Sequence, residues 1–171
     1  MADKSDKSDK SDNLTHFDKD GRPHMVNVGE KQASLRIAIA TGFVRVNAET
    51  VTIVKQQKLS KGDVLAIAEL AGIMGAKQTA HLIPLCHPLG LDHVALQLDL
   101  RDDGIMITAE CRITGKTGVE MEAMTAVSVA ALTIYDMCKA VDKGITIEDI
   151  RLKHKSGGKS GIFNADITRQ K

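Results

Sequence analysis

Basic residues and glycines gather in residues 151–161, which read RLKHKSGGKSG. The segment carries Arg151, Lys153, Lys155 and Lys159 and contains no acidic residue. Its glycines allow the backbone to approach a ligand closely, and basic side chains with free N–H groups suit a phosphate or polyphosphate. The alternative is a solvated, flexible loop between two strands, and composition alone does not decide between them.

This segment is not a P-loop. That motif requires a glycine five residues before the Gly-Lys-Ser/Thr triplet. Lys153 holds that position before the triplet at 158–160, and Glu110 holds it before the triplet at 115–117. The sequence therefore does not predict ordinary ATPase or GTPase chemistry.

A second candidate is the segment PLCHPL at residues 84–89. Its two prolines stiffen the loop, and a rigidly held His87 could bind a ligand or transfer a proton. A zinc site is not favoured by the spacing of His81, Cys86, His87 and His93, since no Cys-x-x-Cys or His-x-x-x-His pair is present. Cys86 is not favoured as a nucleophile, because in extended backbone the adjacent His87 side chain points away from it.

Charged pairs mark both ends of a predicted long helix. Asp136 and Lys139 are three residues apart and share a helix face. They are either a surface pair or an acid/base pair in which each shifts the other's pKa, and their apolar neighbours predict partial burial and the second reading. Glu120 and Glu122 lie near the helix start, where they would complement the helix dipole.

Alternating strands and helices must position these residues. Residues 33–46 predict a strand, and residues 48–57 predict a short helix. A second helix follows Ser60, with Asp63 as a weak capping signal. Helical spacing predicts a buried stripe that consists of Val64, Ile67, Ala68, Ala71 and Met74.

Residues 93–101 and 104–114 alternate between apolar and polar positions, with a tight Asp-Asp-Gly turn at 102–104. This pattern predicts a β-hairpin. The apolar face of its second strand consists of Ile105, Ile107, Ala109, Cys111 and Ile113.

Thr117 and Glu120 have the spacing of a capping box, which predicts a helix running from there to about Lys143 with Gly144 as its C-cap. This helix is apolar around most of its circumference, which in so small a domain indicates burial against another subunit. Residues 145–154 and 161–168 predict two further strands. The order of elements predicts an α+β, ferredoxin-like (split βαβ) fold, an antiparallel sheet packed with helices and one short additional helix.

Composition excludes several classes of protein. The 171 residues suffice for one domain and carry a formal net charge of +1. A near-neutral chain is not expected to coat nucleic acid, and four aromatic residues, Phe17, Phe43, Phe163 and Tyr135, provide no base-stacking platform. No run of 18 apolar residues is present, so no membrane span is predicted.

Residues 3–12 repeat Lys, Ser and Asp and offer no apolar side chain to bury. Residues 1–13 are therefore predicted to be a disordered tail, and residues 14–171 a single domain. The beginning of the chain lacks the apolar core of a signal peptide. Three widely spaced cysteines argue against a disulfide framework, and together these features predict a cytoplasmic location.

Four long motifs resemble one enzyme family, cyclic pyranopterin monophosphate synthase, the C protein of molybdenum cofactor biosynthesis. They are KGDVLAIAELAGIMGAKQT, LIPLCHPL, CRITGKTGVEMEAMTAVSVAALTIYDMCKAVDKG and KSGGKSG. The resemblance extends over roughly residues 14–166. It implies a ferredoxin-like catalytic subunit in a homohexamer, a trimer of dimers, with active sites at dimer interfaces.

The resemblance also implies a reaction. The substrate would be 3′,8-cyclo-7,8-dihydroguanosine 5′-triphosphate, and the products cyclic pyranopterin monophosphate and pyrophosphate. No cofactor is required by the sequence, which leaves open whether Mg²⁺ accompanies the triphosphate. Neither nucleic acid nor a membrane is an expected partner.

The resemblance assigns roles to particular residues. Those implied for catalysis are Asp136 as acid/base, Lys139 as its partner, and Lys61. Those implied for substrate binding are Leu85, Cys86, His87, Met121, Glu122, Glu120, Lys155 and Arg36. By composition alone Lys61 and Arg36 are ordinary surface residues. The chain departs from the family pattern at Asn27 and His81, where the family often has Asp.

Two other functions remain as alternatives. A catalytically silent nucleotide-binding or scaffold protein could retain the same fold, and it would bind purine triphosphates without turnover. An RNA-binding ferredoxin-like module is disfavoured, because the predicted strands lack surface aromatic residues for stacking bases.

Overall fold

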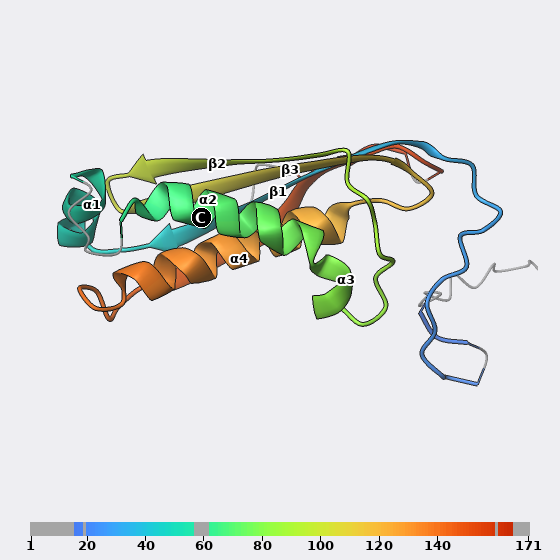
Figure 1. The fold of residues 1–171 in the computed structure, drawn as a ribbon, viewed down its shortest axis with the longest axis horizontal. Coiled ribbons are helices and arrows are strands. Elements are labelled where there is room, and N and C mark those ends of the chain that lie inside the picture. Colours follow the sequence, from blue (N-terminus) through green and yellow to red (C-terminus); the bar gives the residue numbers. More distant parts are fainter. Residues whose placement is uncertain (1–15, 19, 57–61, 160, 166–171) are drawn as a thin grey trace, which may run out of the picture.

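The computed structural model describes residues 16–18, 20–56, 62–159 and 161–165. The predicted disordered tail and Lys61 lie outside the described residues. The described chain forms one antiparallel sheet with helices against it (Figure 1). The strands are β1 (Ser34–Arg45), β2 (His93–Arg101), β3 (Gly104–Gly115), β4 (Thr146–Ser156) and β5 (Phe163–Asn164). The helices are α1 (Ala48–Lys55), α2 (Val64–Lys77), α3 (Thr79–Leu82) and α4 (Glu120–Cys138).

The strand order β2-β3-β1-β4-β5 confirms the predicted α+β class. Strand β3 pairs with both β1 and β2 and so lies between two strands that helices connect along the chain. This is the split βαβ arrangement, which is compatible with a ferredoxin-like fold. The predicted hairpin is confirmed as well, with Arg101 opposite Gly104 across the turn.

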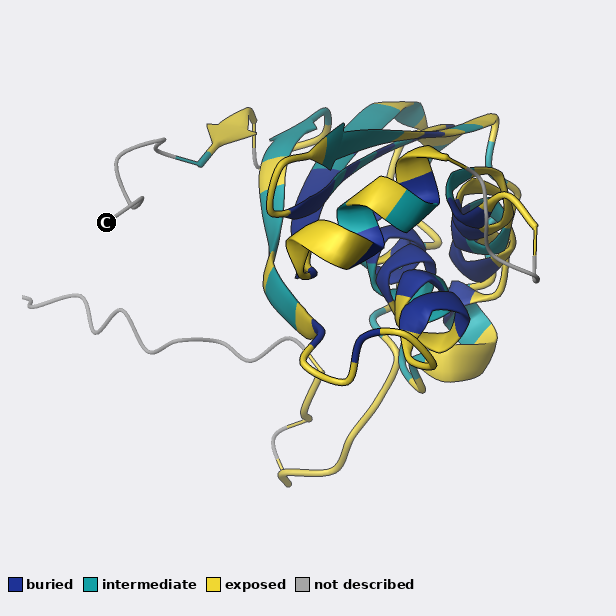
Figure 2. Ribbon diagram, turned by 90° about the vertical axis from the view of Figure 1, so that its left-hand side faces the viewer, coloured by how far each residue is buried: buried dark blue, intermediate teal, exposed yellow. Residues whose placement is uncertain are grey.

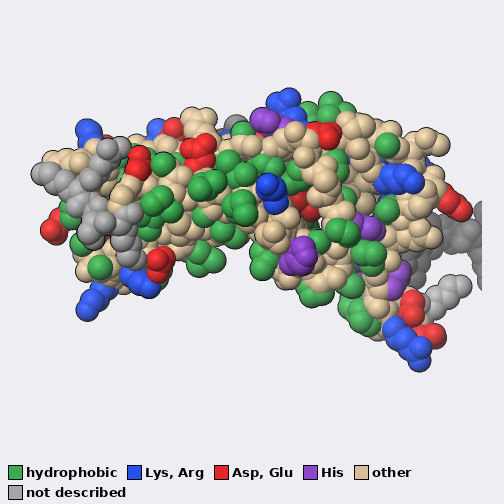
Figure 3. Space-filling model, viewed as in Figure 1, with side chains coloured by type: hydrophobic (Ala, Val, Ile, Leu, Met, Phe, Trp, Pro, Cys, Tyr) green, Lys and Arg blue, Asp and Glu red, His purple; other side chains and the backbone are tan. Residues whose placement is uncertain are grey.

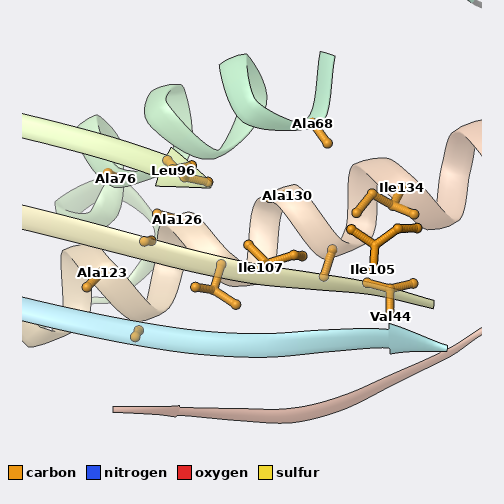
Figure 4. Packing of buried hydrophobic residues seen from close by; sticks show 14 of the residues in the cluster. Val44, Ala68, Ala76, Leu96, Ile105, Ile107, Ala123, Ala126, Ala130 and Ile134 are labelled. Atoms are coloured by element: carbon orange, nitrogen blue, oxygen red, sulfur yellow. The ribbon is translucent and has the colours of Figure 1, made fainter. Parts of the chain in front are cut away.

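The core fills the space between the sheet and the helices, as an end-on view shows (Figure 2). The apolar face predicted for β3 is confirmed, since all five of its side chains are buried. Small residues bring α2 close to α4 (Figure 4). A β-carbon on Gly75 would lie 2.7 Å from Cγ2 of Val129, so the helices require glycine there to reach this distance.

Helix α2 begins later than Ser60 suggests. Asp63 is itself the N-cap and accepts hydrogen bonds from the backbone N–H groups of Leu65 and Ala66. The predicted stripe is partly wrong, because Ile67 is 40% exposed and Met74 is 48% exposed. The physical reason is that small residues of α2, the buried glycines at 72 and 75, form the contact with α4 instead.

Helix α4 is shorter than predicted at its end, and its start lacks the predicted cap. The N-cap is Val119, without a side-chain hydrogen bond, so the capping-box prediction was wrong. The carboxylate of Glu120 lies against Gly118 and accepts a hydrogen bond from Lys155. The helix ends at Cys138, and buried Asp142, which follows it, accepts a hydrogen bond from the backbone N–H of Asn47.

The last predicted strand is also shorter in the described part of the chain. Strand β5 covers only Phe163–Asn164, and residues 166–168 lie outside the description. It pairs with the end of β4, where a ring nitrogen of His154 lies 2.7 Å from the side-chain oxygen of Asn164. This short hairpin holds residues 157–159 of the glycine-rich loop beside the start of β1.

Apolar side chains remain exposed on α2 and α4, where Figure 3 shows hydrophobic groups gathered over the helices. Leu70 is 62% exposed and Leu132 is 59% exposed. Within the described residues, α4 is the helix long and apolar enough to cross a membrane by length and composition, with a mean hydropathy of 1.2. However, 56% of that stretch is buried inside the chain, as in the core helix of a folded domain.

Candidate functional site

A cavity of about 1390 Å³ lies at the end of the subunit where α4 begins. Its walls come from the N-terminal segment 26–32, the start of β1, the residues that lead into α4, the proline-held loop 84–89 and the glycine-rich loop 157–159. Figure 1 shows these segments, far apart in the sequence, converging at one end of the sheet. The split βαβ connections therefore create the site.

Every residue predicted for substrate binding lines this cavity. They are Arg36, Leu85, Cys86, His87, Glu120, Met121, Glu122 and Lys155. The fold thus brings together residues from β1, α4, β4 and the loop between α3 and β2. Their role in binding substrate stays a prediction.

The residues predicted for catalysis lie elsewhere or outside the description. Asp136 and Lys139 are at the opposite end of α4 from Glu120, about 24 Å along the helix axis at 1.5 Å per residue. They form an ion pair of 2.6 Å, with side chains 60% and 53% exposed, so the predicted partial burial is wrong within one subunit. Lys61 lies outside the described residues.

The glycine-rich loop packs directly on Arg36. Gly157 and Gly158 have φ values of 99° and 71°, which disfavour other residues. A β-carbon at Gly158 would collide with the guanidinium of Arg36, and one at Gly157 with the carbonyl oxygen of Leu35. The two glycines are therefore needed to close the loop over this side of the cavity.

Lys155 and Glu120 form an ion pair inside the cavity. Nζ of Lys155 donates to Oε1 of Glu120 at 3.0 Å, and each side chain is 30% exposed. The carboxylate lies against Gly118, where a β-carbon would collide with it. An anionic ligand that took Lys155 as a partner would have to compete with Glu120 for it.

Glu122 is the most deeply buried acidic residue of the cavity, at 4% exposure. Burial raises its pKa from 4.5 to about 7, and the nearby charge of Glu120 adds to the increase. A carboxyl group with that pKa is divided between its two protonation states at neutral pH. It can therefore accept or donate a proton to a bound ligand.

His87 is held by the N-terminal segment. Its Nε2 lies 2.9 Å from the carbonyl oxygen of Val26, and because a carbonyl can only accept, this nitrogen carries the hydrogen. The neutral ring then has its lone pair on Nδ1. Holding one nitrogen this way fixes the orientation of the ring, as a proton-transfer group requires.

His87 and Glu122 also line a second cavity of about 260 Å³, together with Pro88 and Gly90. His81 lies on this second cavity rather than in the first. This departure from the family pattern is therefore not part of the lining of the larger cavity. The other departure, Asn27, accepts a hydrogen bond from the backbone N–H of Gly29 through its side-chain oxygen, as an aspartate could.

The surroundings of Cys86 do not favour a nucleophilic role. Burial raises the pKa of the Cys86 thiol, and Glu122 raises it further, so the thiolate that a nucleophile needs is disfavoured. None of Cys86, Cys111 and Cys138 forms a disulfide bond. Within the described ranges, no three His, Cys, Asp or Glu side chains are placed to bind a metal ion.

Sequence reasoning missed other residues of the cavity. Lys116 donates a hydrogen bond of 2.6 Å to the carbonyl oxygen of Gly29 and thereby fixes the N-terminal segment as a wall. Ser34 and Thr117 line the cavity with hydroxyl groups. Ser34 lies two residues before Arg36 and therefore on the same face of β1, because side chains on a strand alternate between its faces. This alternation could have identified Ser34 from the sequence. The spacing of Thr117 and Glu120 predicts a helix cap instead.

Comparison with known proteins gives consistent matches. The model of the MoaC family matches residues 25–158. A protein of Dinoroseobacter shibae is 59% identical over 155 residues, which are 90% of this chain and 98% of the relative. Proteins of Desulfitobacterium hafniense and Rhodospirillum rubrum are each 56% identical, over 88% and 89% of this chain and 93% of each relative. All three relatives are named cyclic pyranopterin monophosphate synthase.

Proposed function

The chain belongs to the MoaC family, and from this premise we propose that it is a lyase of molybdenum cofactor biosynthesis. It converts 3′,8-cyclo-7,8-dihydroguanosine 5′-triphosphate to cyclic pyranopterin monophosphate and releases pyrophosphate. The observation that carries the proposal is the convergence of eight expected substrate-binding residues on one cavity. Its volume of about 1390 Å³ is ample for a nucleotide-sized ligand.

The charges of the cavity suit a triphosphate. Arg36, Lys116, Lys155 and Lys159 all line it. Cations of this kind neutralise phosphate oxygens and stabilise the charge that develops as a phosphorus–oxygen bond breaks. Closing the cyclic phosphate forms a bond from a sugar oxygen to the α-phosphorus and breaks the bond to the leaving pyrophosphate.

Proton transfers during the ring rearrangement need groups that change protonation near neutral pH. Glu122 meets this requirement through its raised pKa, and His87, whose ring orientation is fixed by its hydrogen bond to Val26, lines the same cavity. Met121 and Leu85 supply the apolar part of the wall for the purine-derived ring. Recognition of that ring rests on these groups rather than on aromatic stacking.

Asp136 and Lys139 take part only if a second subunit brings them to the cavity. Their position at the far end of α4 supports an active site shared between subunits of a homohexamer, in which one subunit supplies the cavity and another supplies this pair. The exposed apolar residues of α2 and α4, such as Leu70 and Leu132, support an interface along these helices. Lys61 completes the predicted catalytic set, and the reaction takes place in the cytoplasm.

The proposal is tested by incubating purified protein with the cyclo-dihydroguanosine triphosphate and measuring pyrophosphate and the pyranopterin product. Asp136→Asn should lose most of the activity, and Asp99→Asn, at a partly exposed position of β2 away from the cavity, should keep it. Absence of product from well-folded protein would refute the lyase. Tight binding of purine triphosphates without turnover would then support a nucleotide-binding protein.

A further inference from the structure

Three buried polar atoms within the described residues have no hydrogen-bond partner. They are Oγ of Ser34, Nε of Arg36 and Oγ1 of Thr117. All three residues line the large cavity. Buried polar groups without partners are rare in folded proteins, so three in one cavity need an explanation.

The sheet register shows that the three residues are neighbours. Ser34 and Arg36 are two residues apart on β1 and point to the same face, the one that α4 covers further along the strand. Ser34 pairs with Gly115 of β3, and Thr117 follows only two residues later. The three side chains therefore belong to one wall of the cavity, between the start of β1 and the start of α4.

The chemistry of these atoms defines the missing partner. The Nε of arginine can only donate a hydrogen bond, and each hydroxyl can donate one. Nε of Arg36 requires an acceptor, and a ligand with several acceptors can satisfy all three atoms at once. The same cavity contains Lys155 and Lys159, and the glycine-rich loop lies over Arg36, so the acceptor is expected to be anionic.

The carboxylates that line the same cavity are compatible with an anionic ligand. The charge of Glu120 is offset by Lys155 at 3.0 Å. The raised pKa of Glu122 leaves that group partly neutral at pH 7. Glu30 also lines the cavity, and the lysines in its lining, Lys31, Lys116, Lys155 and Lys159, outnumber the charged carboxylates of Glu30 and Glu120.

We propose that the hydroxyls of Ser34 and Thr117 and the Nε of Arg36 form a phosphate subsite. It holds one phosphate of the substrate's triphosphate and afterwards the leaving pyrophosphate, a role that rests on the proposed function. Hydroxyl and guanidinium donors fix the orientation of the phosphate, whereas the lysines supply charge without direction. Ser34 and Thr117 are then binding residues that determine how the triphosphate lies.

The test measures the binding of inorganic pyrophosphate to the full chain by isothermal titration calorimetry. Ser34→Ala and Thr117→Val should each weaken the affinity about tenfold, as expected for losing a hydrogen bond to a charged group. Ser128→Ala and Thr133→Val are matched controls, because their hydroxyls donate to backbone carbonyls within α4, and they should bind as the unaltered chain does. Thr117→Ser keeps the hydroxyl and should keep the affinity.

Each outcome bears on the subsite separately from the lyase reaction. Unchanged affinity in Ser34→Ala and Thr117→Val would overturn the subsite, as would no pyrophosphate binding by the unaltered chain. An equal loss in Thr117→Ser would also overturn it, since the hydroxyl would not be the cause. If the chain shows no turnover while the two variants still lose pyrophosphate affinity, the subsite stands and the lyase proposal fails.

Discussion

At the scale of single residues, Glu122 makes the stability of the protein depend on pH. Its pKa of about 7 in the folded protein, against 4.5 as the ordinary value, means that the folded state binds more protons than the unfolded state between these pH values. The free energy of unfolding therefore falls as pH rises from 4.5 through 7 and stays low above that. The shift corresponds to about 3 kcal/mol at most.

Glu122→Gln is predicted to remove this pH dependence. Above pH 7 the variant should be more stable than the unaltered chain, because the amide carries no charge to bury, while near pH 4.5 the two should be alike. Urea unfolding at pH 5 and pH 8 measures the difference, and Glu69→Gln, an exposed position of α2, serves as the control. A stability difference that does not change with pH would contradict the assignment.

Lys155 is predicted to matter for substrate binding more than for stability. A partly exposed ion pair such as that with Glu120 contributes only about 1 kcal/mol or less. Lys155→Met should therefore unfold at nearly the same urea concentration but raise KM for the triphosphate at least tenfold. Lys153→Met, an exposed lysine of the same strand outside the cavity, should leave KM unchanged. Equal effects of the two substitutions would argue against a specific role for Lys155.

At the scale of elements, the contact between α2 and α4 depends on small residues. Gly75→Ala should destabilise the protein by about 1–3 kcal/mol, because the added methyl group would press on Val129. The cost of Val129→Ala should be smaller in the Gly75→Ala background than alone, since the smaller side chain makes room. Urea unfolding of the four proteins in this double-mutant cycle tests the coupling, and purely additive effects would contradict it.

The sequence predicted most elements because their signals are local. Strict alternation identified the β2–β3 hairpin, since side chains on a strand follow a period of two. The start and end of α4 could not be found this way, because they depend on distant partners. Glu120 binds Lys155 on β4, and Asp142 binds the backbone of Asn47, and both contacts exist only in the folded chain.

The candidate site likewise contains residues that the sequence identifies and residues that only the fold reveals. His87 and Glu122 stand in distinctive motifs, so the resemblance to a known family identified them and the fold brought them to one cavity. Ser34 and Thr117 belong to no motif that signals chemistry. Their unpartnered hydroxyls become visible only when β1 and the residues before α4 are seen to share a wall.

At the scale of the whole molecule, the predicted functional residues fall into two groups. The cavity with His87 lies at one end of α4, and the Asp136–Lys139 pair lies at the other. A single subunit cannot bring the two groups together, because a rigid helix of about 24 Å separates them. The proposed shared active site therefore makes a prediction about mixed oligomers.

Subunit complementation tests this central claim most directly. His87→Ala and Asp136→Asn are each expected to be inactive alone, and the two proteins are mixed under conditions that exchange subunits, with exchange verified by native mass spectrometry. If each site takes His87 from one subunit and Asp136 from another, about one quarter of the sites in a random equal mixture are intact, and pyrophosphate release should recover to about that fraction. A mixture that forms mixed oligomers yet stays inactive would contradict the account.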